Sequence, residues 1–409
     1  MTEPAPNPLW AGRTLALLGI LLVALNLRTA VAALSPIVDE IDADIGLPVA
    51  VVGILGMLPP VCFAVFGILT PVFTRRIRLE PLMVIALFAM GAGHLVRGLA
   101  PNTLVLVLAS TLAFAGLGVG NVLLPPLVKK YFPDRVGLLT SVYVTILALS
   151  TLVPPLVSVP IADSISWRLS LGIWAALTVV AIVPWVSLII RHRTGPGEGH
   201  LEEADSSLVG RVWHSSVAWG LAAVFAVSSL NAYALFAWLP TLLVDEAGST
   251  PAEAGALLAL YAGIGLPGGI IVPWLAVRMR RVDPLVYVGV AFFLSGYLGL
   301  LLAPATLTWL WVALAGLGPM LFPLALVLIN LRTRTHAGSV ALSGFTQGVG
   351  YSVGALGPLV VGLLHEASGG WTIPVIFLAG STVVAVLAGT IVGRPHMLED
   401  SGRTSDEPV

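Results

Sequence analysis

Residues 191–215, RHRTGPGEGHLEEADSSLVGRVWHS, form the longest polar stretch of the chain. Glycine, serine and charged residues dominate this stretch, and segments of such composition behave as flexible linkers. Long apolar runs precede and follow it. The sequence therefore predicts two domains, residues 1–190 and residues 216–409, joined by a polar linker.

The composition excludes a water-soluble fold. The chain has 409 residues, of which 57% are hydrophobic and only 10% are charged, and its mean hydropathy is +0.98. A soluble domain carries about 25% charged residues because its surface must face water. We therefore expect most of this surface to face the lipid bilayer. The formal net charge of −1 gives no support to nucleic-acid binding, and the single cysteine, Cys62, excludes an intrachain disulfide and a cysteine-cluster metal site.

Twelve apolar runs can each cross the roughly 30 Å hydrocarbon core as a helix of about 20 residues. They lie at 13–34, 49–73, 81–100, 103–127, 137–160, 169–190, 216–243, 253–276, 284–303, 306–329, 338–364 and 372–393. The predicted fold is therefore an all-α polytopic membrane protein with twelve transmembrane helices in two sets of six. The first run could instead be a cleaved signal peptide. Asn26 and Arg28 inside it, and the odd number of spans left without it, favour a retained helix.

The positions of lysine and arginine predict the orientation, because cytoplasmic loops are enriched in both residues. These residues cluster after the second, fourth, sixth, eighth and tenth runs and in both terminal segments, whereas Arg97 and Arg168 fall on the opposite side. We therefore expect both termini and the linker to be cytoplasmic and the protein to reside in the cell membrane. A wrong number of helices would disrupt this alternation, so the bias also supports the count.

The two halves of the sequence resemble each other. Three pairs of short motifs recur in corresponding places: AGLG at 115–118 and 315–318, RRIRLEPL at 75–82 and RMRRVDPL at 278–285, and PLV at 155–157 and 358–360, the last followed by Trp167 and Trp371. A parallel repeat of six plus six spans resembles the major facilitator superfamily. The resemblance implies two six-helix bundles around one central site, which opens alternately to each side of the membrane.

Individual motifs support this resemblance. Gly67, Leu69, Arg75 and Arg76 fit the superfamily signature between its second and third helices, although Pro71 stands near the place of the usual aspartate and the second glycine is absent. Further stretches resemble the branch of cyanate permeases and nitroimidazole exporters. They are NLR at 26–28, GLGVGN at 116–121, FPDR at 132–135, WLP at 238–240, FPLAL at 322–326, LSGFTQ at 342–347 and GY at 350–351.

Arg28 carries the clearest functional signal. A cation in the middle of a transmembrane helix costs about 2.5–3.5 kcal/mol, and no aspartate or glutamate lies well inside a predicted span. Arg28 is therefore either a structural strut bonded to carbonyls or amides, or a ligand whose missing partner is the substrate. A small anion or an electron-rich planar molecule would suit the guanidinium, and we favour this second interpretation. For Asn26, about 200° away around the helix, we favour packing.

The eleventh span carries two further candidates for substrate contacts. Gln347 and Tyr351 bring an amide and a phenol to one stripe of the helix, near the middle of the span. Glycines at 344, 348 and 354 share this stripe, and glycines at such spacing usually mark close helix packing.

The seventh and fourth spans carry the remaining candidates. Asn231 and Trp238 share one face of the seventh span, whereas Tyr233 lies about 200° from Asn231 and would reach the same cavity only if the helix were distorted. Trp238 also suits an anchor at the membrane interface. Asn121 follows three glycines in the fourth span, where it could cap a distortion or line the cavity.

We expect a secondary active transporter of a small anionic or electron-rich planar solute, such as a cyanate-like anion, a small carboxylate or a nitroimidazole-type compound. Alternating access would proceed around a central site containing Arg28. The alternatives are a multidrug or other small-molecule efflux transporter of the same fold, with Arg28 structural, and a non-transporting sensor or channel. We do not expect an enzyme, because no nucleophile with a neighbouring base occurs in the spans. We expect no cofactor and no metal, and a monomer whose partner is its small-molecule substrate.

Overall fold

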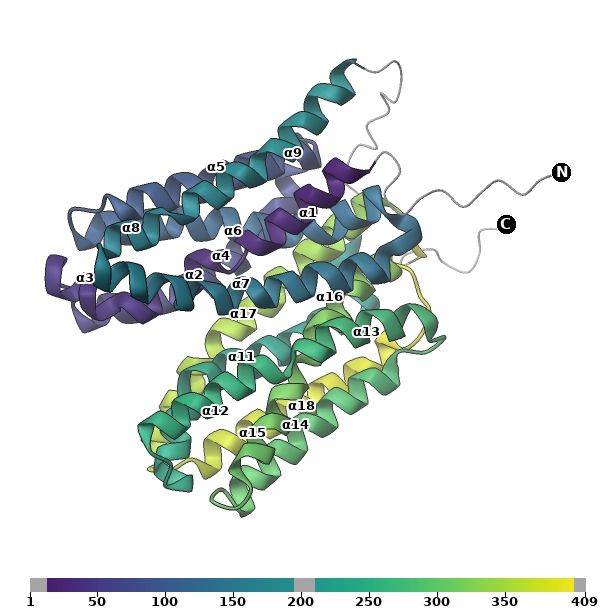
Figure 1. Ribbon diagram of the computed structural model, residues 1–409. Helices are drawn as coiled ribbons and strands as arrows, with labels where there is room; N and C mark the ends of the chain where they lie inside the picture. The colour runs from purple at the N-terminus through teal and green to yellow at the C-terminus, as the bar shows by residue number, and fades with distance from the viewer. Residues whose placement is uncertain (1–12, 195–209, 401–409) are drawn as a thin grey trace.

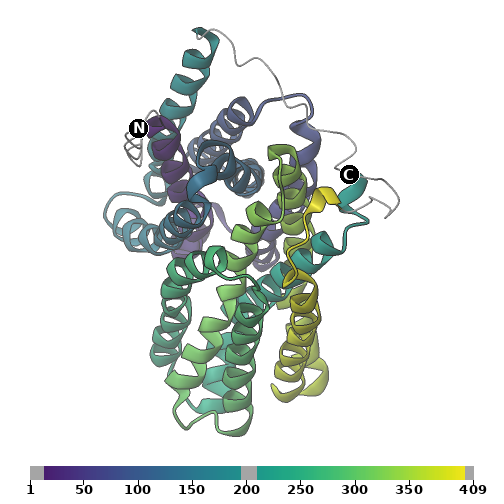
Figure 2. The same ribbon diagram turned by 90° about the vertical axis from the view of Figure 1, so that its right-hand side faces the viewer.

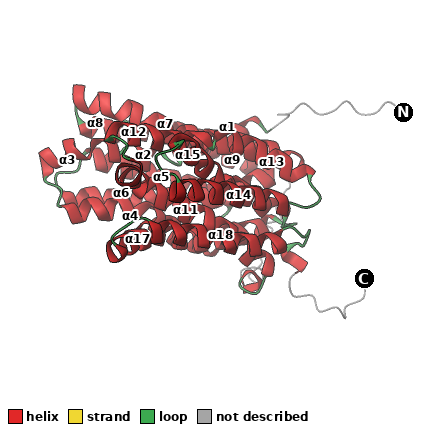
Figure 3. Cartoon of the chain, turned by 90° about the horizontal axis from the view of Figure 1, so that it is seen from below, coloured by secondary structure: helices red, strands yellow, loops and turns green. Residues whose placement is uncertain are grey.

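The computed structural model describes residues 13–194 and 210–400, in which the regular elements are helices (Figure 3). Twelve segments in these ranges are long and apolar enough to cross a membrane, which confirms the predicted number of spans and the all-α fold. The backbone of a membrane span must satisfy its own hydrogen bonds, and a continuous helix does so. Large apolar side chains on the outer surface stay exposed, among them Phe88 at 70% and Leu156 at 75%.

The first half contains six spans, of which the first and sixth are interrupted. Its helices are α1 (Thr14–Asn26), α2 (Thr29–Ala32), η1 (Ser35–Ile37), α3 (Val38–Ile45), α4 (Val49–Phe73), α5 (Leu79–Gly98), α6 (Thr103–Tyr131), η2 (Pro133–Arg135), α7 (Val136–Ser164), α8 (Trp167–Gly172) and α9 (Trp174–Thr194). The last helix thus runs past residue 191, where we expected the linker to begin. Residues 195–209 of that linker lie outside the described residues.

The second half also contains six spans, of which the eighth and tenth are interrupted. Its helices are α11 (Ser216–Ala247), α12 (Pro251–Ile264), α13 (Leu266–Arg278), α14 (Asp283–Leu302), α15 (Thr308–Leu317), η3 (Gly318–Met320), α16 (Leu321–Leu331), α17 (His336–Ser368), α18 (Thr372–Val392) and η4 (Leu398–Asp400).

The two halves converge at one end of the molecule and diverge at the other (Figure 1). We call the converging end the arginine-rich end. It is formed by the loops at 74–78, 132–135, 279–282 and 332–335, and residues 13 and 400 lie there. The opposite end is the far end. In Figure 2, which faces the arginine-rich end, α17 rises from the second half to lie against α4 and α6, and α13 packs on α7.

Corresponding asparagines fasten the first helix of each half to the last. The Oδ1 atom of Asn26 on α1 accepts a hydrogen bond of 3.0 Å from Thr178 on α9. In the second half, Nδ2 of Asn231 on α11 donates to Ser381 on α18 at 2.9 Å. Both asparagines are fully buried. The packing role expected for Asn26 is therefore confirmed, and Asn231 has the equivalent role.

A second pair of corresponding contacts lies at the far end. The indole Nε1 of Trp167 donates to Asp44 at 3.0 Å, and that of Trp371 donates to Asp245 at 2.8 Å. Hydrogen bonds from Arg168 and Trp167 lower the pKa of the Asp44 carboxyl. The two tryptophans that mark the sequence repeat thus make the same contact in each half.

Arg97 is a second arginine inside the bundle. We expected it at the outer end of the span at 81–100, and it lies there in the last turn of α5, but its side chain is fully buried. Its Nη1 atom donates to the carbonyl of Ala30 at 2.9 Å, and its guanidinium lies 5.6 Å from the ring of Phe114. The carbonyl and the ring draw the side chain into the bundle, so Arg28 is not the only arginine within the spans.

Candidate functional site

The first span is interrupted where Arg28 stands. The helix α1 ends at Asn26 and α2 begins at Thr29, and Arg28 has φ −123° and ψ −10°. Two side chains bond to the backbone here, because Thr29 Oγ1 donates to the carbonyl of Asn26 at 2.8 Å and Asn26 Nδ2 donates to that of Leu22 at 2.8 Å. Such local bonds compete with a regular helix. They place Arg28 at a break rather than in the continuous helix that the sequence predicted.

Arg28 is a half-buried residue, and its guanidinium has few partners. Its Nη2 atom lies 3.4 Å from the hydroxyl of Tyr351, and its Nη1 atom lies 3.3 Å from the carbonyl of Leu27. The ring of Phe63 lies 5.5 Å from its central carbon, within the range of a cation–π contact. The ion pairs among the described residues all lie elsewhere.

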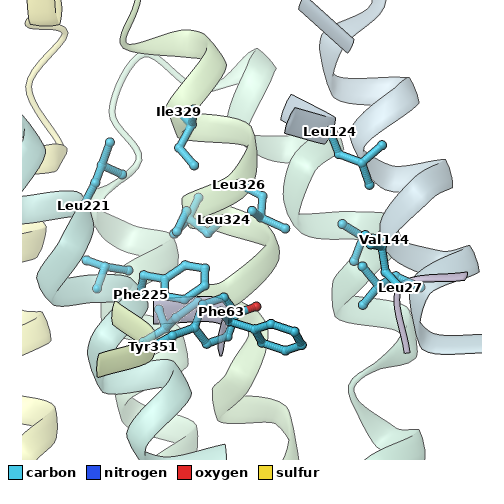
Figure 4. Packing of buried hydrophobic residues seen from close by; sticks show 14 of the residues in the cluster. Leu27, Phe63, Leu124, Val144, Leu221, Phe225, Leu324, Leu326, Ile329 and Tyr351 are labelled. Carbon is cyan, nitrogen blue, oxygen red and sulfur yellow. The ribbon is translucent and has the colours of Figure 1, made fainter. Parts of the chain in front are cut away.

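Four aromatic side chains gather beside Arg28, and we call them the aromatic group: Phe63, Phe225, Tyr233 and Tyr351. The ring of Tyr351 lies 5.1 Å from that of Phe63, 5.0 Å from that of Phe225 and 6.4 Å from that of Tyr233. Figure 4 shows Phe63, Phe225 and Tyr351 close together, with Tyr351 packed against each of the two phenylalanines. They come from α4, α11 and α17, so both halves contribute to the site.

Two members of the aromatic group, Phe63 and Phe225, escaped the sequence analysis. A phenylalanine within an apolar span looks like any other core residue, and no motif distinguishes these two. The correspondence of the two halves gives a signal for Tyr233 but none for these two phenylalanines.

Arg28 and Tyr233 occupy equivalent positions in the two halves. Each lies two positions after the buried asparagine of its own half, Asn26 or Asn231, and both therefore face the centre.

Asn231 and Trp238 lie outside the aromatic group. Besides Ser381, Asn231 contacts Tyr297, whose hydroxyl donates to its Oδ1 at 2.6 Å. The Nε1 atom of Trp238 donates to the carbonyl of Pro358 at 2.8 Å, and its ring lies 5.9 Å from that of Trp371. Direct contact of either residue with a solute stays a prediction, and in this conformation both are held inside the second half. The helix α11 brings Tyr233 to the centre without the distortion that we had thought necessary, because Asn231 faces the other way.

Asn121 and Gln347 lie together at the boundary of the two halves. The Nε2 atom of Gln347 donates to the backbone carbonyl of Asn121 at 3.1 Å, while Asn121 Nδ2 donates to the carbonyl of Leu117 in its own helix at 3.0 Å. Both residues are buried. The structure thus joins two candidate residues to each other, one turn of α17 away from Tyr351.

A lysine joins the two halves by hydrogen bonds on the side of the candidate site that faces the arginine-rich end. Lys129 on α6 donates to the carbonyl of Asn330 at 3.0 Å, to the hydroxyl of Thr333 at 2.8 Å and to the carbonyl of Thr333. These acceptors lie at the end of α16, where helix carbonyls lack partners within the helix and carry partial negative charge. The candidate site is therefore covered on the arginine-rich side by polar contacts between the halves.

Comparisons with known proteins agree with this architecture. The family model of the Major Facilitator Superfamily matches residues 16–355. An uncharacterized transporter of Bacillus subtilis (strain 168), YycB, is 30% identical over 387 residues, which cover 94% of this chain and 94% of the relative. Two relatives from Escherichia coli (strain K12) are the 2-nitroimidazole transporter, 29% identical over 93% of this chain and 96% of the relative, and the cyanate transport protein CynX, 25% identical over 90% and 96%.

Solved structures share the fold at low sequence identity. A crystal structure of the transporter FucP in the outward conformation matches with a TM-score of 0.70 at 14% identity, covering 93% of this chain and 99% of that one. The proton:xylose symporter XylE matches with a TM-score of 0.70 at 14% identity, covering 95% and 98%. The extent of the family match, the near-equal lengths of the relatives and the twelve spans together show that this chain is a multi-pass membrane transporter and belongs to the Major Facilitator Superfamily.

Proposed function

We propose that this protein is a secondary active transporter of a small anionic or electron-rich planar solute, which binds at Arg28 between the two halves. One observation carries the proposal. Arg28 is a half-buried residue at a helix break on the boundary of the halves, and the groups around its guanidinium are a phenol, a backbone carbonyl and a ring rather than a carboxylate. A cation within a membrane span requires a counter-charge or dipoles. A solute that carries negative charge would supply them.

The aromatic group restricts the shape of the solute. Phe63 and Tyr351 present rings beside the guanidinium, and flat solutes stack on such rings while the planar fork of arginine bonds to their oxygen or nitrogen atoms. The names of two relatives, a 2-nitroimidazole transporter and a cyanate transport protein, refer to one planar heterocycle and one linear anion. Both are small, electron-rich solutes of the kind that this site would accept.

The orientation forms part of the proposal. The loops of the arginine-rich end carry most of the basic residues, and such loops are normally cytoplasmic. With this orientation the conformation described here, closed at the arginine-rich end, is outward-facing.

Thermal stability tests the role of Arg28 in purified full-length protein. We expect cyanate or 2-nitroimidazole to raise the melting temperature of the wild type, because a ligand that binds only the folded state stabilises it. Arg28→Gln should keep its melting temperature without ligand and lose the ligand-induced rise. Losing a charge-assisted contact costs about 2–5 kcal/mol, which is roughly 30-fold or more in affinity. The ligand-induced rise of Arg28→Lys should lie between those of the wild type and Arg28→Gln, because lysine keeps the charge and loses the planar fork.

Arg97→Gln is the matched control. Arg97 is fully buried and donates to Ala30, so its loss should lower the melting temperature without ligand and spare the ligand-induced rise. Solute exchange in proteoliposomes gives the functional readout. A well-folded Arg28→Gln variant with undiminished exchange would contradict the proposal, and so would a wild type whose melting temperature neither compound changes.

A further inference from the structure

Two consecutive prolines, Pro125 and Pro126, lie inside α6. Proline has no amide hydrogen, so the carbonyl four residues earlier loses its partner within the helix. The two carbonyls affected here are those of Asn121 and Val122, and both residues are buried. Buried carbonyls need a hydrogen-bond donor from elsewhere.

The missing donors come from the other half of the molecule. On α17, Gln347 Nε2 donates to the carbonyl of Asn121 at 3.1 Å, and Ser343 Oγ donates to that of Val122 at 2.8 Å. Gln347 and Ser343 lie one turn apart and are joined by a hydrogen bond of 2.9 Å. Neither side chain is more than 1% exposed. Two adjacent donors on one half therefore meet the two carbonyls that the prolines leave unpaired on the other, and we call this pair of bonds the carbonyl latch.

We infer that the carbonyl latch holds the arginine-rich end closed and that Gln347 and Ser343 are gate residues rather than solute contacts. The halves can separate at this end only if both bonds break. Water can then hydrate the freed carbonyls. Each bond therefore stabilises the closed conformer only by the difference in free energy between a hydrogen bond to the donor and one to water. The latch thus makes the closed conformer more populated while still allowing it to open.

The latch also adjoins the candidate solute site. Tyr351, which contacts Arg28, lies one turn beyond Gln347 on α17. A solute that moves Tyr351 acts on the same helix that carries the latch donors. The inference rests on the alternating access of the proposed function but not on the role of Arg28 or on the identity of the solute, and it is therefore tested without any solute.

The reporter is a single cysteine at Val144 in a Cys62→Ser background. Val144 is buried on α7 and faces Gly269 of the other half, so a thiol there reacts with a maleimide mainly when the arginine-rich end opens. We expect Ser343→Ala and Gln347→Met each to raise the alkylation rate by roughly two- to tenfold. Methionine keeps nearly the volume of glutamine and removes the donor. The matched control is Ser352→Ala on the same helix, whose hydroxyl bonds only to its own helix at Gly348, and it should leave the rate unchanged.

The prolines are tested by a double-mutant cycle. Replacing Pro125 and Pro126 by alanine restores the helix donors, so Gln347→Met should raise the rate less in that background than in the wild type. Unchanged rates in both Ser343→Ala and Gln347→Met, with melting temperatures retained, would overturn the latch. If Gln347→Met raised the alkylation rate as much in the alanine background as in the wild type, the role that we assign to the two prolines would be wrong. Loss of solute binding in an Arg28 variant bears on neither result, so the two proposals can fail separately.

Discussion

Residue type alone does not separate Arg28, the proposed solute ligand, from Arg97, which is packed inside one half. Arg28 and Arg97 lie in the same half, and each contacts a backbone carbonyl and an aromatic ring. Arg97 is fully buried, whereas Arg28 is partly exposed at the boundary of the halves. This difference in burial and position is why we assign solute binding to Arg28 in our proposal and a supporting role to Arg97.

At the same scale, the ring of Phe63 should contribute to solute binding through the guanidinium that it faces. We expect Phe63→Leu to weaken binding several-fold, because a cation–π contact is worth about 0.5–2 kcal/mol. Tyr351→Phe should lower the affinity for the solute about fivefold, since it removes one neutral hydrogen bond of about 1 kcal/mol. Isothermal titration measures both. Phe293→Leu is the control, because Phe293 stacks on Tyr297 within the second half. A loss as large as that of Arg28→Gln in either variant would contradict this ranking.

At the scale of elements, the backbones of the two halves approach each other closely where α4 meets α17. A Cβ atom on Gly67 would lie 2.8 Å from the Cα of Gly348, and one on Gly344 would lie 2.7 Å from the carbonyl oxygen of Gly67. Backbone atoms cannot yield as a flexible side chain can. Glycine is therefore required at these positions for the arginine-rich end to close, and Pro71 packs against Gly344 where the family signature usually has its aspartate.

Gly67→Ala should therefore open the arginine-rich end. The added methyl group forces α4 and α17 apart, and the alkylation rate of a cysteine at Val144 should rise at least several-fold. Gly56→Ala on the same helix is the control, because a Cβ atom there meets nothing within 4 Å while the gain in helix propensity is the same. Equal rates in the two variants would show that the contact does not limit closure.

At the scale of the whole molecule, the halves converge at the arginine-rich end and diverge at the far end (Figure 1). Besides the contact of Arg28 with Tyr351 in the candidate site, polar contacts from Lys129, Ser141, Ser343 and Gln347 join the halves among the described residues. Opening that end requires all of these contacts to break together.

The proposed orientation makes a direct prediction for intact cells. With Cys62→Ser as background, a cysteine at Ser249, at the far end, should react with a membrane-impermeant maleimide added outside. A cysteine at His214, at the arginine-rich end, should react only after the cells are permeabilised. Reaction of both cysteines from outside, or of His214→Cys alone, would refute the orientation.

Hydropathy and charge determined much of this fold by themselves. The twelve spans, their order and the repeat of the two halves follow from apolar runs. A segment can span the bilayer only if its own residues are sufficiently apolar, wherever its neighbours lie. The importance of Arg28 also follows locally, since a cation in an apolar run is costly wherever its neighbours lie. The sequence could therefore name the central residue of the candidate site before any contact was known.

Tertiary structure alone decided how the helices are rotated and which distant residues meet. It turned Tyr233 rather than Asn231 toward Arg28, added Phe63 and Phe225, which no sequence motif distinguishes, and buried Arg97. It also joined Gln347 and Ser343 to carbonyls 226 and 221 residues away. In a helix that is apolar on all sides, hydropathy does not specify which face points inward. The face is chosen by packing between helices, and the sequence records that packing only through contacts that form once the two halves have come together.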